Sequence, residues 1–92
     1  MGRKRDKLLE RFCSNPKDFT YDELRTLLRG FGYEEDQRGS TSGSSVAFFR
    51  QRDGLTIYLH KPHPPILKAY QIRAIRQKLK ENGDIDEQCS AL

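Results

Sequence analysis

Residues 45–60 read SVAFFRQRDGLTIYLH, two runs of β-forming residues joined by an Asp-Gly turn signal. In the second run, apolar and polar residues alternate strictly. Leu55, Ile57 and Leu59 therefore face one side of a sheet, and the opposite face carries Thr56, Tyr58 and His60. This stretch predicts an antiparallel hairpin whose apolar face the rest of the chain must cover.

The first strand of this hairpin, residues 45–51, places two phenylalanines on opposite faces. The phase of Val46 puts Phe48 in the core and leaves Phe49 on the outer face, beside Ser45. The polar residues 33–38 predict an edge strand that joins the hairpin. After residue 60, a segment with three prolines ends the sheet, because proline cannot donate a ladder hydrogen bond.

Helical patterns flank these strands. Thr20 and Glu23 form a capping box before an apolar stripe that runs to Phe31, and Gly30 and Gly32 end the helix. Residues 4–13 predict a shorter helix, which ends at the Ser-Asn-Pro sequence of residues 14–16.

The last helix is expected over residues 68–82, with Gly83 after it. Its buried stripe consists of Ile72, Ile75 and Leu79. The element order α-α-β-β-β-α predicts an α+β domain: a three-stranded antiparallel sheet with helices packed on one face.

Composition fits one small domain and excludes a large multidomain enzyme, since the chain has 92 residues, of which 35% are hydrophobic. No apolar run approaches the roughly 18 residues of a membrane-spanning helix, so we expect a soluble, cytoplasmic protein with no membrane partner. Cys13 and Cys89 lie far apart in sequence and form no CxxC motif. We therefore expect free thiols, no metal site and no cofactor.

The net charge of +4 is concentrated in two places. Residues 1–17 hold six basic side chains against two acids. Residues 68–80 hold five basic side chains and no acid. Within the last helix, Arg73, Arg76 and Lys80 form a ridge beside the buried stripe, which we expect near the seam between helix and sheet. Two basic elements suit a polyanionic partner, because neutralising phosphates releases counterions.

Several segments together resemble the HicA-type toxins. FTYDELRTLLRGFGY (residues 19–33) resembles the first helix and glycine turn of that family. The Gly-Ser loop before VAFF (residues 46–49), the strand end Leu59-His60 and AYQIRAIRQKL (residues 69–79) follow in the family's order. The resemblance covers residues 18–85, and leaves a basic N-terminal helix, 1–17, and a polar tail, 86–92, outside it.

This resemblance implies a fold like that of a double-stranded-RNA-binding domain and the activity of an mRNA interferase, an endoribonuclease. It also implies neutralisation by a HicB-type antitoxin protein. One position departs from the family: its catalytic histidine follows Gly-Ser, whereas here Ser45 follows Gly43-Ser44. A serine hydroxyl does not titrate near neutral pH, so cleavage is left open.

His60 is the best remaining candidate for a general base, and Ser45 holds the position of the family's catalytic residue. The candidate RNA-binding residues are the following: Arg38, Lys68, Arg73, Arg76 and Lys80. Two alternatives stay open on the same fold: a non-catalytic RNA-binding module, and a protein-interaction domain. A homodimer is a further alternative for its assembly.

Overall fold

The computed structural model describes residues 3–36 and 45–91. These form an α+β fold, as predicted, with three helices and one three-stranded antiparallel sheet. The elements are α1 (Arg3–Cys13), α2 (Tyr21–Gly30), β1 (Glu34–Asp36), β2 (Ser45–Arg50), β3 (Leu55–His60) and α3 (Ala69–Glu81). The strand order is β1-β2-β3, so β1 is an edge strand, as its polar sequence predicts.

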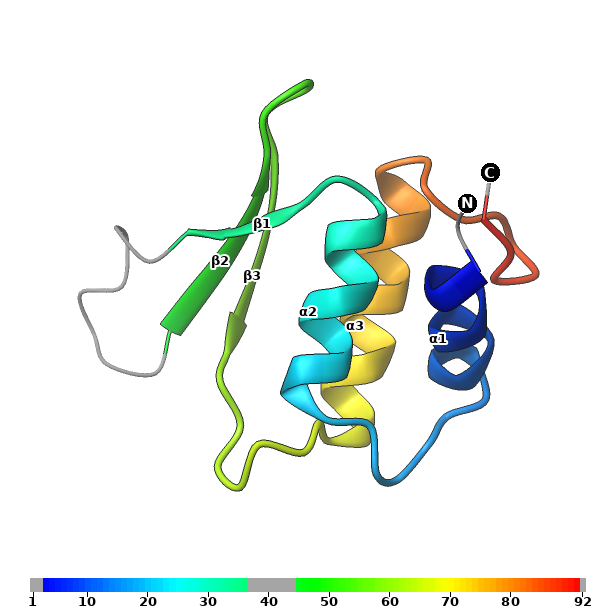
Figure 1. The fold of residues 1–92 in the computed structure, drawn as a ribbon, viewed down its shortest axis with the longest axis vertical. Coiled ribbons are helices and arrows are strands. Elements are labelled where there is room, and N and C mark those ends of the chain that lie inside the picture. Colours follow the sequence, from blue (N-terminus) through cyan, green and yellow to red (C-terminus); the bar gives the residue numbers. More distant parts are fainter. Residues whose placement is uncertain (1–2, 37–44, 92) are drawn as a thin grey trace.

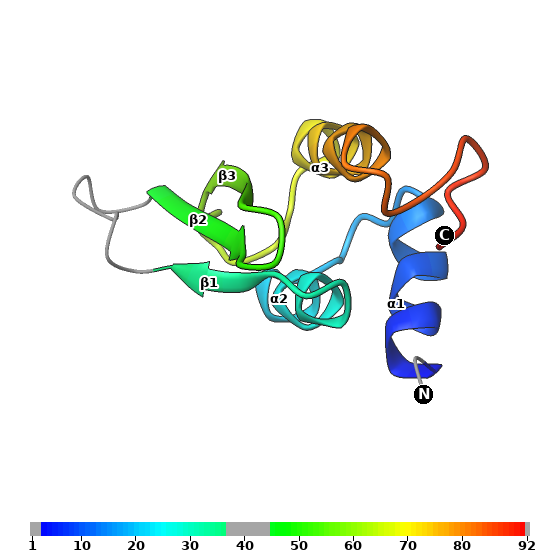
Figure 2. The ribbon, with the colours of Figure 1, turned by 90° about the horizontal axis from the view of Figure 1, so that it is seen from above.

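The elements are arranged in three layers (Figures 1 and 2). The sheet forms the first layer, α2 and α3 form the second, and α1 packs on the far side of this helix pair. All three helices therefore lie on one side of the sheet, as predicted. The opposite face of the sheet is left without a covering element among the described residues.

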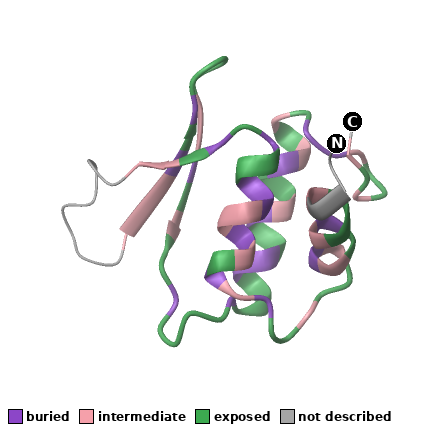
Figure 3. Ribbon diagram, viewed as in Figure 1, coloured by how far each residue is buried: buried purple, intermediate pink, exposed green. Residues whose placement is uncertain are grey.

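Strand pairing confirms the two faces of the sheet. Phe48 pairs with Ile57, and both are buried beneath the helices. On the other face Phe49 is 39% exposed and Tyr58 is 77% exposed. Figure 3 shows buried residues along the helices, whereas most residues of the strands are intermediate or exposed.

Helix α2 begins and ends as its sequence predicts. The Thr20 hydroxyl accepts a hydrogen bond from the Glu23 amide, and the Glu23 carboxylate accepts one from the Thr20 amide. After the helix, Gly32 turns the chain with a φ of +98°, a conformation that favours glycine. This turn directs Tyr33 into the core and starts β1.

Glu23 also accepts a hydrogen bond from Arg11 of α1, the largest of the effects that lower the pKa of this carboxyl group. A lowered pKa in the folded state stabilises the protein above the unfolded value of about 4.3, and this contribution is lost as the pH falls. Glu23→Gln keeps the capping geometry but removes the charge. We expect it to lower the free energy of unfolding by about 0.5–1 kcal/mol at pH 7 and by less at pH 3.

Urea unfolding at both pH values measures this effect, with Glu10→Gln as the control. Glu10 is exposed and has no ion pair with a described residue. A Glu23→Gln deficit that is the same at pH 3 and pH 7 would contradict the prediction.

Helix α1 belongs to the same core as residues 18–85. Its Leu9 and Phe12 are buried, and the centre of the Phe12 ring lies 5.3 Å from the centre of the Phe19 ring. At the other end of the chain, Cys89 and Ala91 also pack against this core. The segments before residue 18 and after residue 85 thus both contribute to one packed unit.

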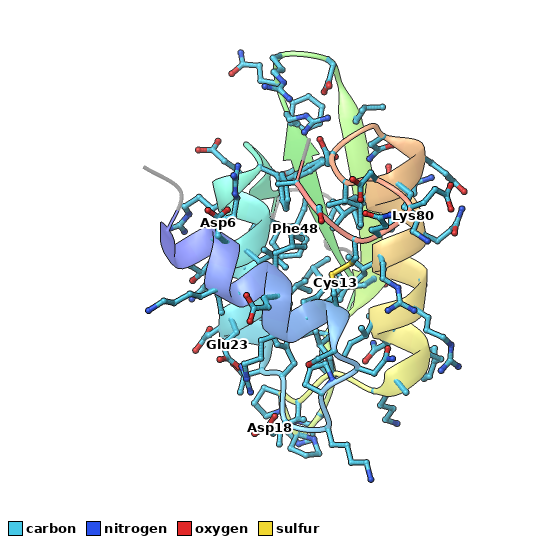
Figure 4. The ribbon with its side chains drawn as sticks, turned by 90° about the vertical axis from the view of Figure 1, so that its right-hand side faces the viewer. Asp6, Cys13, Asp18, Glu23, Phe48 and Lys80 are labelled. Carbon is cyan, nitrogen blue, oxygen red and sulfur yellow. A yellow bond between two sulfur atoms is a disulfide. The ribbon has the colours of Figure 1, made fainter. Side chains whose placement is uncertain are left out.

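The prediction of free thiols is wrong, because Cys13 and Cys89 form a disulfide. The chain after α3 turns back across α1 and brings the two Cα atoms to 6.2 Å, within the range that a disulfide spans. Figure 4 shows the bond at the end of α1. Sequence spacing alone could not reveal this contact, because it depends on the packing of both chain ends.

A cross-link between residues 76 positions apart restricts the unfolded chain strongly. We expect the double variant Cys13→Ser/Cys89→Ser to lose about 2–4 kcal/mol of unfolding free energy. Guanidinium unfolding without reductant measures this loss. Wild-type protein in excess dithiothreitol should match the variant, and a midpoint unchanged by dithiothreitol would contradict the prediction.

Candidate nucleic-acid interface

The predicted basic residues of the last helix lie along α3, apart from Lys68, which immediately precedes it. Burial of Ile72, Ile75 and Leu79 fixes the rotation of this helix. Lys68 and Arg73 are then exposed, and Arg76 and Lys80 are half-buried. At 1.5 Å per residue, Lys68 and Lys80 lie about 18 Å apart along the axis.

The position of this ridge differs from the expected one. Arg76 donates a hydrogen bond of 3.3 Å to Asn15, in the loop after α1. It is Gln71 that faces the sheet, where its amide donates to the carbonyl of His60 at 2.9 Å. The ridge therefore lies on the flank of α3 away from the seam between helix and sheet, where Arg76 contacts the loop after α1. The sequence identifies the buried stripe of α3, but it does not show which side of that stripe lies next to the sheet.

Four of the five cations in residues 68–80 have no acidic partner among the described residues. Arg11 binds Asp18 and Glu23, and Arg25 binds Asp22 and Glu35. Within the described part of the chain, no ion pair involves the following residues: Lys68, Arg73, Arg76 and Lys80. Lys78 lies 3.8 Å from Glu81. We call the four unpaired residues the α3 cationic surface. Arg38, the fifth predicted RNA-binding residue, lies outside the described residues.

The two predicted catalytic residues are brought together at one end of the sheet. Ser45 and His60 are paired across β2 and β3, and Ser45 Oγ lies 3.4 Å from His60 Nδ1. This separation is long for a hydrogen bond from a hydroxyl group. Imidazole can act as a general base near neutral pH. The pair is on the exposed sheet face, whereas Arg76 of the α3 cationic surface contacts the loop after α1.

The outer sheet face carries aromatic and acidic side chains around a hollow. A hollow of about 300 Å³ lies over β2 and β3 and is bordered by Phe49, Thr56 and Tyr58. Asp36 also borders it, and Glu34 pairs with Phe49 on the same face. Carboxylates beside exposed aromatic rings suit a protein partner better than a polyanion.

Sequence reasoning missed a buried charged cluster around Arg50. This side chain is 2% exposed, and its Nη1 donates to Asp84 at 2.6 Å and to the carbonyl of Phe31 at 3.0 Å. The guanidinium lies 4.4 Å from the centre of the Tyr33 ring. Burial, together with the hydrogen bond to Asp84, raises the pKa of Tyr33 to about 12. The sequence did contain an indication of this burial. Arg50 follows Phe48 by two residues in β2, so both side chains point to the inner face of the sheet.

This cluster joins the end of β2 to the turns that follow α2 and α3, so its role is structural. Among the described residues, no group of three or more His, Cys, Asp or Glu side chains is arranged to hold a metal ion. None of the described helices combines the length and apolar character needed to cross a membrane.

Comparisons of the chain with protein-family models, with curated proteins and with solved structures found no match. The resemblance to HicA-type toxins therefore stays a prediction that rests on the residues quoted above.

Proposed function

We propose that this protein is a HicA-like RNA-binding domain that contacts phosphates through the α3 cationic surface. One observation carries the proposal: four cations follow one helix, and none of them has an acidic partner in the described part of the chain. Elsewhere, Arg11, Arg25 and Arg50 are each held by carboxylates. The other cations without an ion pair in the described part of the chain stand singly in separate segments: Lys7, Lys17, Arg29 and Lys61.

The physical basis is counterion release. Each phosphate that a lysine or arginine neutralises frees condensed ions, so binding weakens steeply with salt. The guanidinium groups of Arg73 and Arg76 also present planar donors that match phosphate oxygens. Because the helix backbone is held by its buried stripe, the cations keep a fixed spacing along the RNA strand.

NMR titration of the ¹⁵N-labelled protein with a short single-stranded RNA tests the proposal. We expect chemical-shift changes along residues 68–80 and at the side-chain amide of Asn15, which contacts Arg76. Changes confined to β2 and β3, or no binding at low salt, would overturn it. The latter result would favour the alternative of a protein-interaction domain.

RNA cleavage is the second candidate function, and the proximity of Ser45 to His60 favours it. In this hypothesis the RNA must reach the pair on a sheet face that also carries Glu34 and Asp36. In this hypothesis His60 acts as the general base toward a ribose hydroxyl group. We expect His60→Ala to reduce the cleavage rate by about 10²–10⁴-fold, as is usual for loss of a general base. Gel analysis of RNA incubated with purified protein measures the rate.

His63→Ala is the matched control, because His63 is also exposed but lies in the loop beyond β3. Equal cleavage by wild type and His60→Ala would contradict a catalytic role for His60. RNA binding without products in any sample would identify the protein as a non-catalytic binder.

A HicB-type antitoxin is the proposed protein partner. The cytoplasm is the proposed compartment; because thiols are kept reduced there, this proposal requires Cys13 and Cys89 to be in the dithiol form in the cell. The exposed rings of Phe49 and Tyr58 support a protein contact on the outer sheet face. Co-expression with a candidate antitoxin, compared between wild type and Tyr58→Ala, tests this surface. Light scattering of the isolated chain measures its mass in solution and so tests the alternative of a homodimer.

A further inference from the structure

A second cationic site lies where α2 and α3 end. A hollow of about 370 Å³ is bordered there by three arginines from separate segments: Arg5 of α1, Arg29 of α2 and Arg52 in the turn between β2 and β3. We propose that this hollow binds a phosphate monoester, carried by a small molecule or by the end of an RNA strand. The inference does not depend on the α3 cationic surface.

Glycines shape this hollow. A Cβ atom on Gly30 would lie 2.7 Å from Cγ of Arg5, so only glycine lets Arg5 cross the end of α2. The Arg5 guanidinium then lies 5.1 Å from the centre of the Phe31 ring. Gly32 and Gly83 also border the hollow, where they turn the chain with φ values of +98° and +79° and add no side chain.

The arginines lack strong acidic partners. Arg29 has no ion pair with a described residue, and Arg52 lies 3.9 Å from an Asp53 carboxylate that Arg50 already holds at 2.9 Å. Arg5 pairs with Asp6, whose side chain is 61% exposed, and such pairs contribute little.

One carboxylate borders the hollow among the described residues, and its charge is already compensated. This is Asp84, which accepts hydrogen bonds of 2.6 Å from both Arg50 and Tyr33. An anion that enters the hollow therefore meets three arginine side chains and one neutralised carboxylate, and the charge of the arginines must also outweigh the partly negative carbonyl ends of α2 and α3.

The chemistry favours a monoester over a diester. Guanidinium groups bind phosphate oxygens through paired donors, and three of them match an anion with three free oxygens. A phosphate monoester offers three such oxygens and a charge near −2 at pH 7, because its second pKa is about 6. A diester inside an RNA chain offers two free oxygens and a charge of −1.

NMR titration with inorganic phosphate and with adenosine monophosphate tests the site, with adenosine as the uncharged comparison. We expect the amides of Gly30, Gly32 and Gly83 to shift with both phosphates and not with adenosine. Arg29→Gln/Arg52→Gln should bind at least tenfold more weakly. Both side chains are exposed, so the variant should fold, which a thermal melt checks.

Lys7→Gln/Lys17→Gln removes the same charge from exposed positions elsewhere and should bind like wild type. Equal weakening in both double variants, or shifts away from the three glycines, would overturn the proposal.

A 5′-phosphorylated RNA that binds more tightly than its 5′-hydroxyl counterpart identifies an RNA end as the source. Binding of adenosine monophosphate without that preference identifies a free small molecule. Removing the α3 cations should leave phosphate binding intact, which separates this site from the proposed function.

Discussion

Replacing Arg50 by methionine is expected to lower the free energy of unfolding by about 3–5 kcal/mol, because it leaves a buried carboxylate without its cation. Asp84 is 5% exposed, and its remaining described partner would be the hydroxyl group of Tyr33. Methionine keeps most of the apolar volume of the arginine stem. The loss of unfolding free energy is therefore due to the missing charge rather than to a cavity. For a domain of this size, the melting temperature should fall by about 20 °C.

Thermal and urea unfolding of four variants measures this effect: Arg50→Met, Asp84→Asn, the double variant of these two, and Arg52→Met. Arg52→Met is the matched control, since Arg52 is 72% exposed and lies 3.9 Å from Asp53; its effect should stay within about 0.5 kcal/mol. Arg50→Met/Asp84→Asn should cost less than the sum of its single changes, because it removes both charges of the pair. Additive losses in the double variant would show that Arg50 and Asp84 are not energetically coupled.

Local patterns predicted the elements of the fold because they depend on neighbours in sequence. The alternation around Ile57 identified β3 and both of its faces, and the capping box at Thr20 identified the start of α2. Contacts between distant segments were not accessible in this way. The Cys13–Cys89 bond and the Arg50–Asp84 pair join residues whose approach depends on how α1 and the chain after α3 pack.

The orientation of the candidate RNA-binding residues also depends on contacts between distant segments, which local patterns do not reveal. Periodicity placed Arg76 and Lys80 beside the buried stripe of α3 but could not say which neighbour they face. In the structure, the contact between Gln71 and His60 sets the sheet side of α3, and the contact between Arg76 and Asn15 sets the opposite side. Alternation placed His60 on the outer face, and strand register then brought Ser45 beside it.

The α3 cationic surface is expected to supply most of the affinity for RNA. We expect Lys68→Gln/Arg73→Gln/Arg76→Gln/Lys80→Gln to bind a 5′-hydroxyl single-stranded RNA about 10²–10³-fold more weakly in 0.1 M salt. The magnitude follows from counterion release, which contributes about 0.7 to the salt slope for each phosphate contact on a single strand. Loss of four contacts should therefore reduce the slope of log K against log salt by about 3.

Fluorescence anisotropy across a range of salt concentrations measures both quantities. The control, Lys7→Gln/Lys17→Gln/Lys61→Gln, removes three positive charges from exposed positions outside α3 and outside the arginine hollow. It should keep most of the slope, because an RNA held by the surface of one helix releases counterions chiefly there. Glutamine is a good helix former, and none of the four α3 cations has an ion pair with a described residue, so the α3 variant should stay folded. If both variants lose the same slope, the affinity reflects net charge, and the α3 cationic surface is not the binding site.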